Sequence, residues 1–470
     1  MRLLFVVFLF ALSWCALLGT TGCANIVPPQ GGPKDSLPPR LVRSSPPDSS
    51  TNFRSGRITL EFDEFIDLKD LTRNVLFTPT FENNPRIEVR LRTMNIIFKD
   101  SLARNSTYTL NFGNALVDMN ESNVLRNFTY IFSTGPVLDS LSLTGNVINA
   151  EDGTIDTTLL VLLYRNLADT AVEKERAPYL ARLNASGAFR LVNLPAGQYK
   201  IYALAESGGR NYLNKTSSFA FLDSAITVAP NRPVPVRLFA YKERSSGSTT
   251  GNTSAPVVPV PGAPKGAERR LRLGFISAPL DIGKPITLTA DAPFRRIDSA
   301  GMQLTDTSFR RLPFSTSLDS TRRILSFNTT LTPGGRYKLI LDQNFAEDSL
   351  GRKLLKTDTL DVAVKALSEY GAASLRFTGL DTGVAAVLQL VQNGNVVRSA
   401  PVVNNQASLE LITPADYSLR LLYDRNRNGV WDPGSYPSPK RQPEIAVPLS
   451  KTLSVKAGFT NEIELAVPPL

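Results

Sequence analysis

Histidine is absent from the 470-residue sequence, and cysteine occurs only twice. Without histidine the chain lacks the commonest general base, the commonest metal ligand, and the base of the Ser-His-Asp and Cys-His nucleophile systems. An enzyme with this composition would have to use carboxylate pairs, a Ser-Lys pair, tyrosine or a carboxylate-bound metal. The absences therefore exclude most hydrolase and metalloenzyme classes and favour a non-enzymatic protein.

Long apolar runs are also scarce, and the one exception lies at the N-terminus. Residues 3–18 are apolar apart from Ser13, follow Arg2 and lead into small residues. Sixteen residues are short against the ~20 that span a bilayer, which is typical of a removable secretion signal. We predict a signal peptide over residues 1–22.

Both cysteines belong to this processing region. Gly22-Cys23 resembles the lipobox of bacterial lipoproteins, although Thr20 stands where that motif usually has leucine. The resemblance implies lipidation of Cys23 and removal of Cys15 with the signal; the alternative is ordinary signal cleavage that leaves Cys23 as a thiol. The residue after Cys23 is Ala24 and not the aspartate that tends to retain lipoproteins in the inner membrane. We therefore predict an outer-membrane lipoprotein that faces the periplasm and contacts the membrane through its N-terminal lipid.

The remaining composition, 42% hydrophobic and 20% charged, is that of a folded chain. Apolar residues alternate with polar ones in short runs such as Ile58, Leu60 and Phe62, separated by turn residues. This period of two predicts an all-β fold of tandem antiparallel β-sandwiches. Residues 23–36 form a Pro/Gly-rich tether, and a Ser/Gly/Pro-rich stretch over 244–270 predicts a linker between two halves.

The two halves resemble one another. Fifty positions separate Ile58 from Tyr108, and fifty-one separate Ile286 from Tyr337. Asp118 and Asp348 then follow at matching places between two predicted strands. This repeat predicts two copies of a pair of sandwiches, or four domains in all.

Two sets of motifs resemble known families. Ile58–Asp63, Tyr108–Leu110 and Phe132–Gly135 are similar to the SbsA-type bacterial Ig-like domain, and Leu143–Val147 with Asn193–Tyr199 are similar to carboxypeptidase-regulatory or prealbumin-like sandwiches. The first half as a whole resembles Ig-like-domain lipoproteins of Bacteroidota, which implies a structural or adhesive module without enzymatic activity. We predict an Ig-like domain (37–137), a prealbumin-like sandwich (138–243), a degenerate Ig-like domain (271–366) and a second prealbumin-like sandwich (367–470).

One segment has the residue types of a calcium loop. Asp424, Asn426, Asn428 and Asp432 place oxygen side chains at offsets 1, 3, 5 and 9, Gly429 lies at offset 6, and the carbonyl of Val430 lies at offset 7. Offset 12 is Ser435 instead of a bidentate glutamate. The alternatives are a Ca²⁺ site and a hairpin loop of Asx-turns in which Trp431 caps the sandwich; no other cofactor is predicted.

Thirteen of the 25 aspartates precede serine or threonine, and ten of these tripeptides end in Ala, Ile, Leu, Val, Met or Thr. The tripeptide is similar to the O-glycosylation signal of Bacteroidota periplasmic proteins. The alternative is that Asp-Ser and Asp-Thr start turns between strands, and both can hold together. The candidate hydroxyls are Ser36, Ser101, Ser140, Thr157, Thr170, Ser224, Ser299, Ser320, Ser349 and Thr359.

Charged residues give weaker signals. Arginine pairs at 269–270, 295–296, 310–311 and 322–323 concentrate basic charge in and just before the third domain. An exported protein meets anionic headgroups, lipopolysaccharide or acidic proteins, so no nucleic-acid partner is predicted. The alternative is a solvated strand surface, which is also the simplest interpretation of Glu61, Asp63, Glu64 and Asp67.

These features predict a non-enzymatic, lipid-anchored cell-envelope protein that acts as a structural spacer or a protein-interaction module. The second hypothesis is a glycan-binding protein or an assembly lipoprotein of an outer-membrane complex, which contacts a glycan or an envelope protein through the Asp424 loop and the third domain. The third is a hydrolase that uses carboxylates alone. An exposed aromatic strip across a sandwich face would favour glycan binding, and a buried carboxylate pair in a cleft would favour the enzyme.

Overall fold

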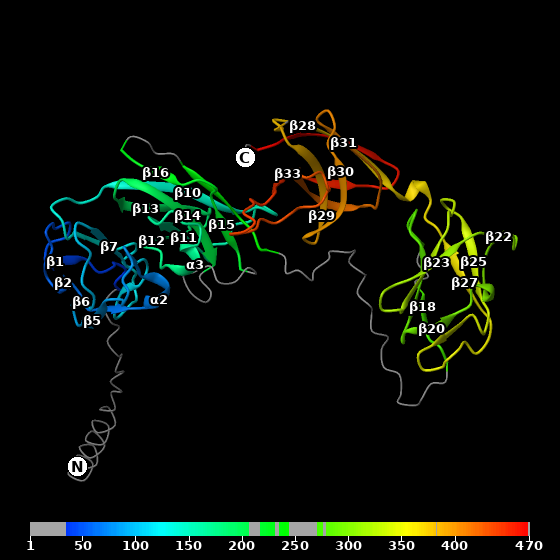
Figure 1. Ribbon diagram of the computed structural model, residues 1–470, viewed down its shortest axis with the longest axis horizontal. Helices are drawn as coiled ribbons and strands as arrows, with labels where there is room; N and C mark the ends of the chain where they lie inside the picture. The colour runs from blue at the N-terminus through cyan, green and yellow to red at the C-terminus, as the bar shows by residue number, and fades with distance from the viewer. Residues whose placement is uncertain are drawn as a thin grey trace, which may run out of the picture. The chain divides into compact units, whose positions relative to one another are not determined.

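The computed structural model describes residues 34–205, 217–230, 235–243, 270–275, 279–381 and 383–468. Strands dominate these ranges and the helices are single turns, so the all-β prediction is confirmed. The chain clusters into two compact units, Met1–Ser140 and Leu141–Leu470. One β-sandwich lies in the first unit and three in the second (Figure 1).

The first sandwich (residues 41–133) packs the sheet β1-β2-β6-β5 against the sheets β4-β7-β9 and β3-β8. Its core is rich in phenylalanine: Phe62, Phe112 and Phe132 are fully buried. The alternating strands place these side chains on the inner face, as period two requires. Its elements are β1 (Leu41–Ser45), β2 (Arg57–Phe62), β3 (Ile66–Leu68), α2 (Leu71–Asn74), β4 (Leu76–Thr78), β5 (Arg86–Arg90), β6 (Thr93–Ile97), β7 (Thr107–Asn111), β8 (Leu116–Asp118) and β9 (Thr129–Ser133).

The third sandwich (residues 273–363) repeats this pairing, with sheets β18-β19-β24-β23, β20-β26 and β22-β21-β25-β27. Single hydrogen bonds recur as well: Ile66 N donates to Leu91 O in the first sandwich, and Phe294 N donates to Arg322 O in the third. Its elements are β18 (Leu273–Phe275), β19 (Ile286–Ala290), β20 (Phe294–Ile297), η1 (Ser299–Gly301), β21 (Met302–Asp306), β22 (Arg311–Leu312), β23 (Ser315–Leu318), β24 (Ile324–Asn328), β25 (Arg336–Leu341), β26 (Ala346–Asp348) and β27 (Asp358–Ala363).

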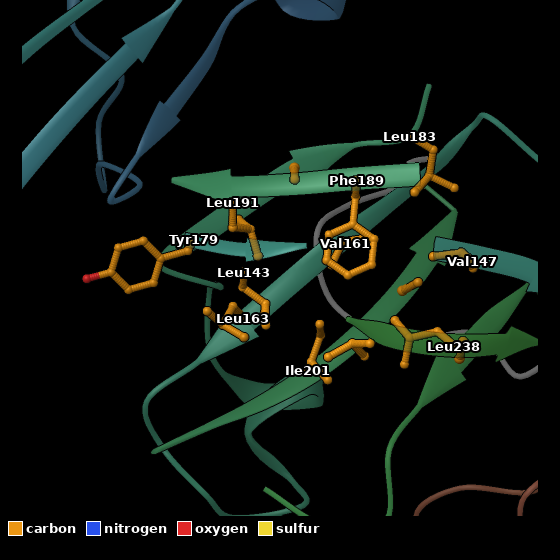
Figure 2. Packing of buried hydrophobic residues seen from close by; sticks show 14 of the residues in the cluster. Leu143, Val147, Val161, Leu163, Tyr179, Leu183, Phe189, Leu191, Ile201 and Leu238 are labelled. Carbon is orange, nitrogen blue, oxygen red and sulfur yellow. The ribbon is translucent and has the colours of Figure 1, made fainter. Parts of the chain in front are cut away.

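The second sandwich (residues 141–240) joins the sheet β13-β10-β17, in which β10 and β17 are parallel, to a sheet built on β12-β11-β14-β15. Figure 2 shows its core, where Phe189, Val161 and Leu238 meet between the sheets. Its elements are β10 (Leu141–Asn149), β11 (Leu159–Tyr164), α3 (Ala171–Lys174), β12 (Tyr179–Arg182), β13 (Ala188–Leu194), β14 (Gly197–Ala205), β15 (Phe219–Phe221), β16 (Ile226–Val228) and β17 (Val236–Ala240).

The fourth sandwich (residues 371–466) has the equivalent sheets β31-β28-β34 and β30-β29-β32-β33, again with one parallel pair, β28 and β34. A tyrosine corner recurs: Tyr199 OH donates to Pro195 O at 2.7 Å, and Tyr417 OH donates to Thr413 O at 2.7 Å. A single 3₁₀ turn, η2 (Leu367–Glu369), precedes the fourth sandwich. Its strands are β28 (Gly371–Thr378), β29 (Ala385–Gln392), β30 (Asn395–Pro401), β31 (Gln406–Ile412), β32 (Ala415–Asp424), β33 (Ile445–Val455) and β34 (Thr460–Ala466).

Two topologies therefore alternate along the chain. The matched landmarks of the sequence repeat fall at equivalent places, Tyr108 on β7 and Tyr337 on β25, Asp118 at the end of β8 and Asp348 at the end of β26. None of the helices in the described part of the chain has the length and apolar character needed to cross a bilayer.

Candidate functional site

The Asp424 loop begins at the last residue of β32. The Asp424 side chain is 1% exposed, and its oxygens accept hydrogen bonds from Gly429 N at 2.7 Å and Asn428 N at 3.2 Å. Gly429 has a φ of +76°, the left-handed conformation that glycine adopts without strain. Asn428 Oδ1 in turn accepts from Val430 N at 2.7 Å. The loop is thus a succession of Asx-turns.

Further contacts hold the same loop. The side-chain amides of Asn426 and Asn428 both donate to Asp432 Oδ2, at 2.5 and 2.7 Å. Glu444, which the sequence motif did not include, accepts from Arg425 N at 2.8 Å and Asp432 N at 3.1 Å. Burial raises the pKa of Glu444, and the nearby Asp424 and Asp432 carboxylates raise it further, against the lowering effect of these two N–H groups.

The Asp424 loop fits calcium only in part. Oxygen atoms stand at the first five ligand positions, but Ser435 at the twelfth donates its hydroxyl to Pro439 O. Within the described ranges, no group of three or more carboxylate or cysteine side chains is arranged to hold a metal ion. Trp431 is 5% exposed and its indole N–H donates to Glu444 O at 2.7 Å, so the ring covers the end of the sandwich. Calcium binding stays a prediction.

The chain that follows this loop, residues 433–444, reaches the second sandwich. The Tyr436 side chain is 1% exposed, and its ring centroid lies 4.8 Å from that of Phe221 and 5.2 Å from that of Phe219. Its hydroxyl donates to Asp169 O at 2.5 Å and lies 2.9 Å from the Tyr202 hydroxyl. An aromatic side chain of the fourth sandwich therefore fills a place on the outer face of the second.

An ionic cluster surrounds Tyr436. Lys200 Nζ lies 2.9 Å and Lys440 Nζ 3.1 Å from the Asp169 carboxylate, and Lys440 also donates to Asp223 O at 3.1 Å. Burial opposes ionisation of Asp169, but hydrogen bonds from both ammonium groups hold its pKa below the ordinary value. One carboxylate thus ties two lysines, one from each sandwich.

A second contact also runs from the fourth sandwich to the second. Arg420 on β32 is 8% exposed; its Nε donates to Gln389 Oε1 at 2.9 Å and its Nη1 donates to Glu151 O at 2.6 Å. Ala446 N donates to Ala150 O at 2.7 Å beside it. Burial lowers the pKa of Arg420. We call the two contacts together, residues 433–444 on the second sandwich and Arg420 on residues 150–151, the clamp.

The clamp was missed from the sequence, although one signal pointed to it. All six residues of β11, Leu159–Tyr164, are apolar and buried. A strand that is buried on both faces has a continuous apolar sequence, and another part of the protein must pack against its outer face. The sequence did not show what provides that cover.

The ten predicted glycosylation hydroxyls all belong to exposed residues, and nine of them lie outside strands. Asp156, Asp298 and Asp319 also form Asx-turns in these tripeptides, which is the alternative interpretation. The exposed positions are accessible to a modifying enzyme, and modification stays a prediction. The nine are Ser36, Ser101, Ser140, Thr157, Thr170, Ser224, Ser299, Ser320 and Ser349, whereas Thr359 lies on β27.

The arginine pairs lie on separate elements of the third sandwich and are exposed. Arg322 donates to Phe294 O at 2.8 Å and to Arg295 O at 3.3 Å, so two of the pairs meet. Arg295 lies 3.5 Å from Glu347, and Arg310 lies 3.0 Å from Asp306. Neighbouring carboxylates thus offset part of the basic charge. Arg269 lies outside the described residues.

The remaining candidates show no paired acid and base. Glu61, Asp63 and Asp67 are exposed and Glu64 is half-buried on the rim of the first sandwich. Within the described residues, the exposed phenylalanines Phe65, Phe309 and Phe459 lie on three different sandwiches, so they form no strip across one face. Cys23 lies outside the described residues.

Comparison with known proteins gives one family match. Residues 35–134 match a family model for the bacterial Ig-like domain. This confirms the Ig-like prediction for the first sandwich, and it covers too little of the chain to classify the whole. No curated protein matches the chain.

Solved structures with some likeness include three surface proteins. The Bacillus anthracis TIE protein is 10% identical over 94% of this chain and 76% of its own, with a TM-score of 0.17. Surface layer protein SbsC, domains 1–6, is 11% identical over 93% and 55%, with a TM-score of 0.16. The major pilin subunit BcpA of Bacillus cereus is 9% identical over 70% and 100%, with a TM-score of 0.16. At TM-scores this low, none of them bears on the fold or function of this chain.

Proposed function

We propose that the chain is a non-enzymatic, lipid-anchored cell-envelope protein, facing the periplasm from the outer membrane, that acts as a structural spacer or protein-interaction module. The observation that carries the proposal is the clamp. The Asp424 loop, which has the residue types of a calcium loop, continues into a segment that joins two sandwiches of the same chain. Its buried polar groups, Asp424, Glu444 and Arg420, are occupied by backbone and side-chain hydrogen bonds that hold this architecture.

The second and fourth sandwiches thus support each other across the 244–270 linker, and the third is joined to the fourth. Asp281 of the third accepts hydrogen bonds from Tyr370 OH and Lys365 Nζ, both at 2.8 Å. Fixed contacts among the second, third and fourth sandwiches suit a protein that holds surfaces at set separations. The prealbumin-like nature of the second and fourth sandwiches belongs to this proposal.

Anchoring is tested on the cells that make the protein. Cys23→Ser removes the acylated thiol, so we expect the variant to leave the outer-membrane fraction while its folded domains stay intact. Intact mass of the wild-type protein from the membrane fraction should exceed that of the unmodified chain by the acyl chains. Sugar masses at the ten hydroxyls are measured in the same spectrum. A wild-type mass equal to the bare chain, with Cys23→Ser still in the membrane, contradicts anchoring.

Spacer and interaction module are separated by crosslinking in intact cells, followed by recovery from detergent-solubilised envelope. A stoichiometric envelope protein that depends on one sandwich supports the interaction module and the assembly alternative. Recovery of the chain alone supports the spacer. The same preparation measures turnover of glycan and ester substrates; activity lost in Asp424→Asn or Glu444→Gln would contradict a non-enzymatic protein.

A further inference from the structure

One end of the first sandwich exposes four large apolar side chains: Leu37 (56% exposed), Phe65 (41%), Leu91 (64%) and Met119 (62%). Backbone hydrogen bonds link the segments that carry them. Met119 N donates to Phe65 O at 2.9 Å, and Ile66 N donates to Leu91 O at 3.1 Å. Asn123, close after Met119, donates to Asp35 O at 3.0 Å and thereby ties in the segment of Leu37. We call these four residues the apolar end.

Leu91 is disfavoured at its position by both the backbone and the solvent. Arg90 pairs with Thr93, so Leu91 and Arg92 form the two-residue turn between β5 and β6. Leu91 has a φ of +54° at the first central position, where such turns prefer glycine. In the third sandwich the equivalent hairpin tip carries Ser320, Thr321 and Arg322. A leucine held in this conformation and exposed to water suggests a contact outside the sandwich.

Two arginines of one hairpin flank part of the apolar end. Arg90, Leu91, Arg92 and Phe65 line an open hollow of ≈ 520 Å³, and the Arg92 guanidinium lies 5.4 Å from the Phe65 ring centroid. Carboxylates also lie close to this end: burial raises the pKa of Glu64, and the neighbouring Asp118, Asp35, Asp63 and Glu121 raise it further. Exposed apolar side chains flanked by long arginines suit a bilayer interface, where the arginines reach the anionic headgroups.

The path of the chain decides between a lipid surface and other partners. Asp35, at the start of the described chain, lies at this same end, and residue 34 follows Cys23 by eleven positions. A fully extended segment of that length spans about 40 Å. If Cys23 is lipidated, the apolar end therefore stays within that distance of the bilayer, at an effective concentration on the order of millimolar.

We propose that the apolar end of the first sandwich, led by Leu91 and flanked by Arg90 and Arg92, docks on the anionic lipid surface to which the chain is anchored. This inference rests on the proposed lipid anchor. Docking would place the first sandwich directly on the membrane.

The test uses the proposed mature chain, residues 23–470, in which Cys23 is the one thiol. Coupling this thiol to a maleimide lipid anchors the chain to vesicles whether or not cells acylate it. Leu91→Trp reports contact through quenching by brominated phosphatidylglycerol. The matched control is Phe309→Trp: Phe309 is 66% exposed, has a φ of +60° and precedes two arginines, but lies on the third sandwich. Buried Trp431 gives the same background in both.

We expect quenching of Leu91→Trp to exceed that of Phe309→Trp at least threefold on vesicles containing phosphatidylglycerol, and to fall on pure brominated phosphatidylcholine. With Met119→Trp as the probe, Leu91→Gly should abolish the quenching in excess of the Phe309→Trp control. Because glycine adopts the left-handed turn without strain, the sandwich stays folded, and the loss would be due to the missing leucine side chain. Equal quenching in the two probe variants, or quenching insensitive to Leu91→Gly, overturns the proposal. Because the chain is anchored chemically in this test, that result would not bear on the proposed native lipid anchor, which the mass measurement tests separately.

Discussion

At the residue scale, Asp118 and Asp348 stabilise equivalent turns of the first and third sandwiches. Asp118 is 1% exposed and accepts hydrogen bonds from the backbone N–H groups of Glu121, Ser122 and Asn123 at 2.5 to 3.0 Å. Burial alone would raise its pKa, but these donors hold the pKa below the ordinary value. The ionised carboxylate is therefore a structural group, and the same holds for Asp348, whose carboxylate accepts from Arg352.

Asp118→Asn should destabilise the first sandwich by about 2 kcal/mol, because a neutral amide loses charge-assisted hydrogen bonds. The matched control is Asp67→Asn on the paired strand β3, where the carboxylate is exposed and accepts only from Leu68 N. Calorimetry of the mature chain measures both. Because the folded pKa of Asp118 is lowered, its contribution is complete above its unfolded pKa near 3.8 and is lost as pH falls through the folded pKa. Equal effects of the two variants would contradict this role.

Calcium titration decides between the two interpretations of the Asp424 loop. A bound ion predicts heat in isothermal titration that Asp432→Ala removes, since Asp432 is one of the predicted ligands. A loop held by its own Asx-turns gives no heat at millimolar Ca²⁺. The full mature chain is used, so that the contacts of residues 433–444 are kept.

At the scale of elements, one cross-strand pair of residues recurs in the second and fourth sandwiches, but the large and the small residue are on exchanged strands. Gly145 on β10 lies opposite Phe189, and at the matching register Leu375 on β28 lies opposite Ala407. The large side chain has changed strands while the total volume is kept, as close packing requires.

Gly145→Ala should destabilise the second sandwich by about 2–3 kcal/mol, because overpacking a close backbone contact forces strands apart. The added Cβ would lie 2.1 Å from Val236 O and 2.7 Å from the Phe189 ring. Gly56→Ala is the control, since a Cβ there meets nothing within 4 Å. Urea unfolding of the mature chain compares them, and a cost for Gly145→Ala no larger than for the control would contradict the packing.

The β32–β33 connection makes its own prediction. Tyr436→Ala removes a buried ring and should lower the free energy of unfolding by about 3–5 kcal/mol. Tyr436→Phe keeps the ring but leaves Tyr202 OH and Asp169 O without that hydroxyl, which should cost about 1 kcal/mol. Phe459→Ala, at a residue 66% exposed on the same sandwich, is the control. Equal losses in all three would show that Tyr436 is not held by the second sandwich.

At the scale of the whole molecule, the clamp joins parts of the chain on either side of the predicted linker, of which only residue 270 is among the described residues. A protease site placed within residues 244–269 should yield two fragments that stay together on size exclusion. Arg420→Met should weaken their association at least 100-fold, about 3 kcal/mol, because Gln389 and Glu151 O lose a buried charged donor. Lys451→Met, at an exposed lysine, is the control. Immediate separation of the wild-type fragments would contradict the clamp.

Association of the nicked fragments should also depend on pH in a defined way. The lowered pKa of Asp169 means that its contribution to the folded state is complete above pH 3.8 and is lost as pH falls through the folded pKa, and the raised pKa of Lys200 means that its contribution is lost only as pH rises above 10.5. The Asp169 carboxylate, which pairs with Lys440 across the two fragments, therefore stays charged between these limits. With no histidine in the chain, no side chain of ordinary pKa titrates between pH 5 and 8. Fluorescence anisotropy of labelled fragments should show constant affinity from pH 5 to 8, and a step within that range would contradict this assignment.

Much of the architecture could be predicted because its signals are local. Ile58, Leu60 and Phe62 alternate with exposed or half-buried neighbours, as period two predicts. Glu444 was not predicted, because it follows Asp424 by twenty residues and reaches the loop only when β33 pairs with β32. The Asp424 motif read alone could not distinguish a metal loop from a self-bonded one.

The sequence by itself determined the all-β class, the recurring pair of sandwiches, the absence of histidine, and the absence of a long apolar run after the N-terminal one. Only the tertiary structure decided that the outer face of the second sandwich is covered by the fourth, and that Leu37, Phe65, Leu91 and Met119 share one exposed end. The reason is physical. Alternation along a strand predicts which side chains point away from the core, but it does not predict what covers them, because the contacting residues can be as far apart in the sequence as Tyr202 and Tyr436.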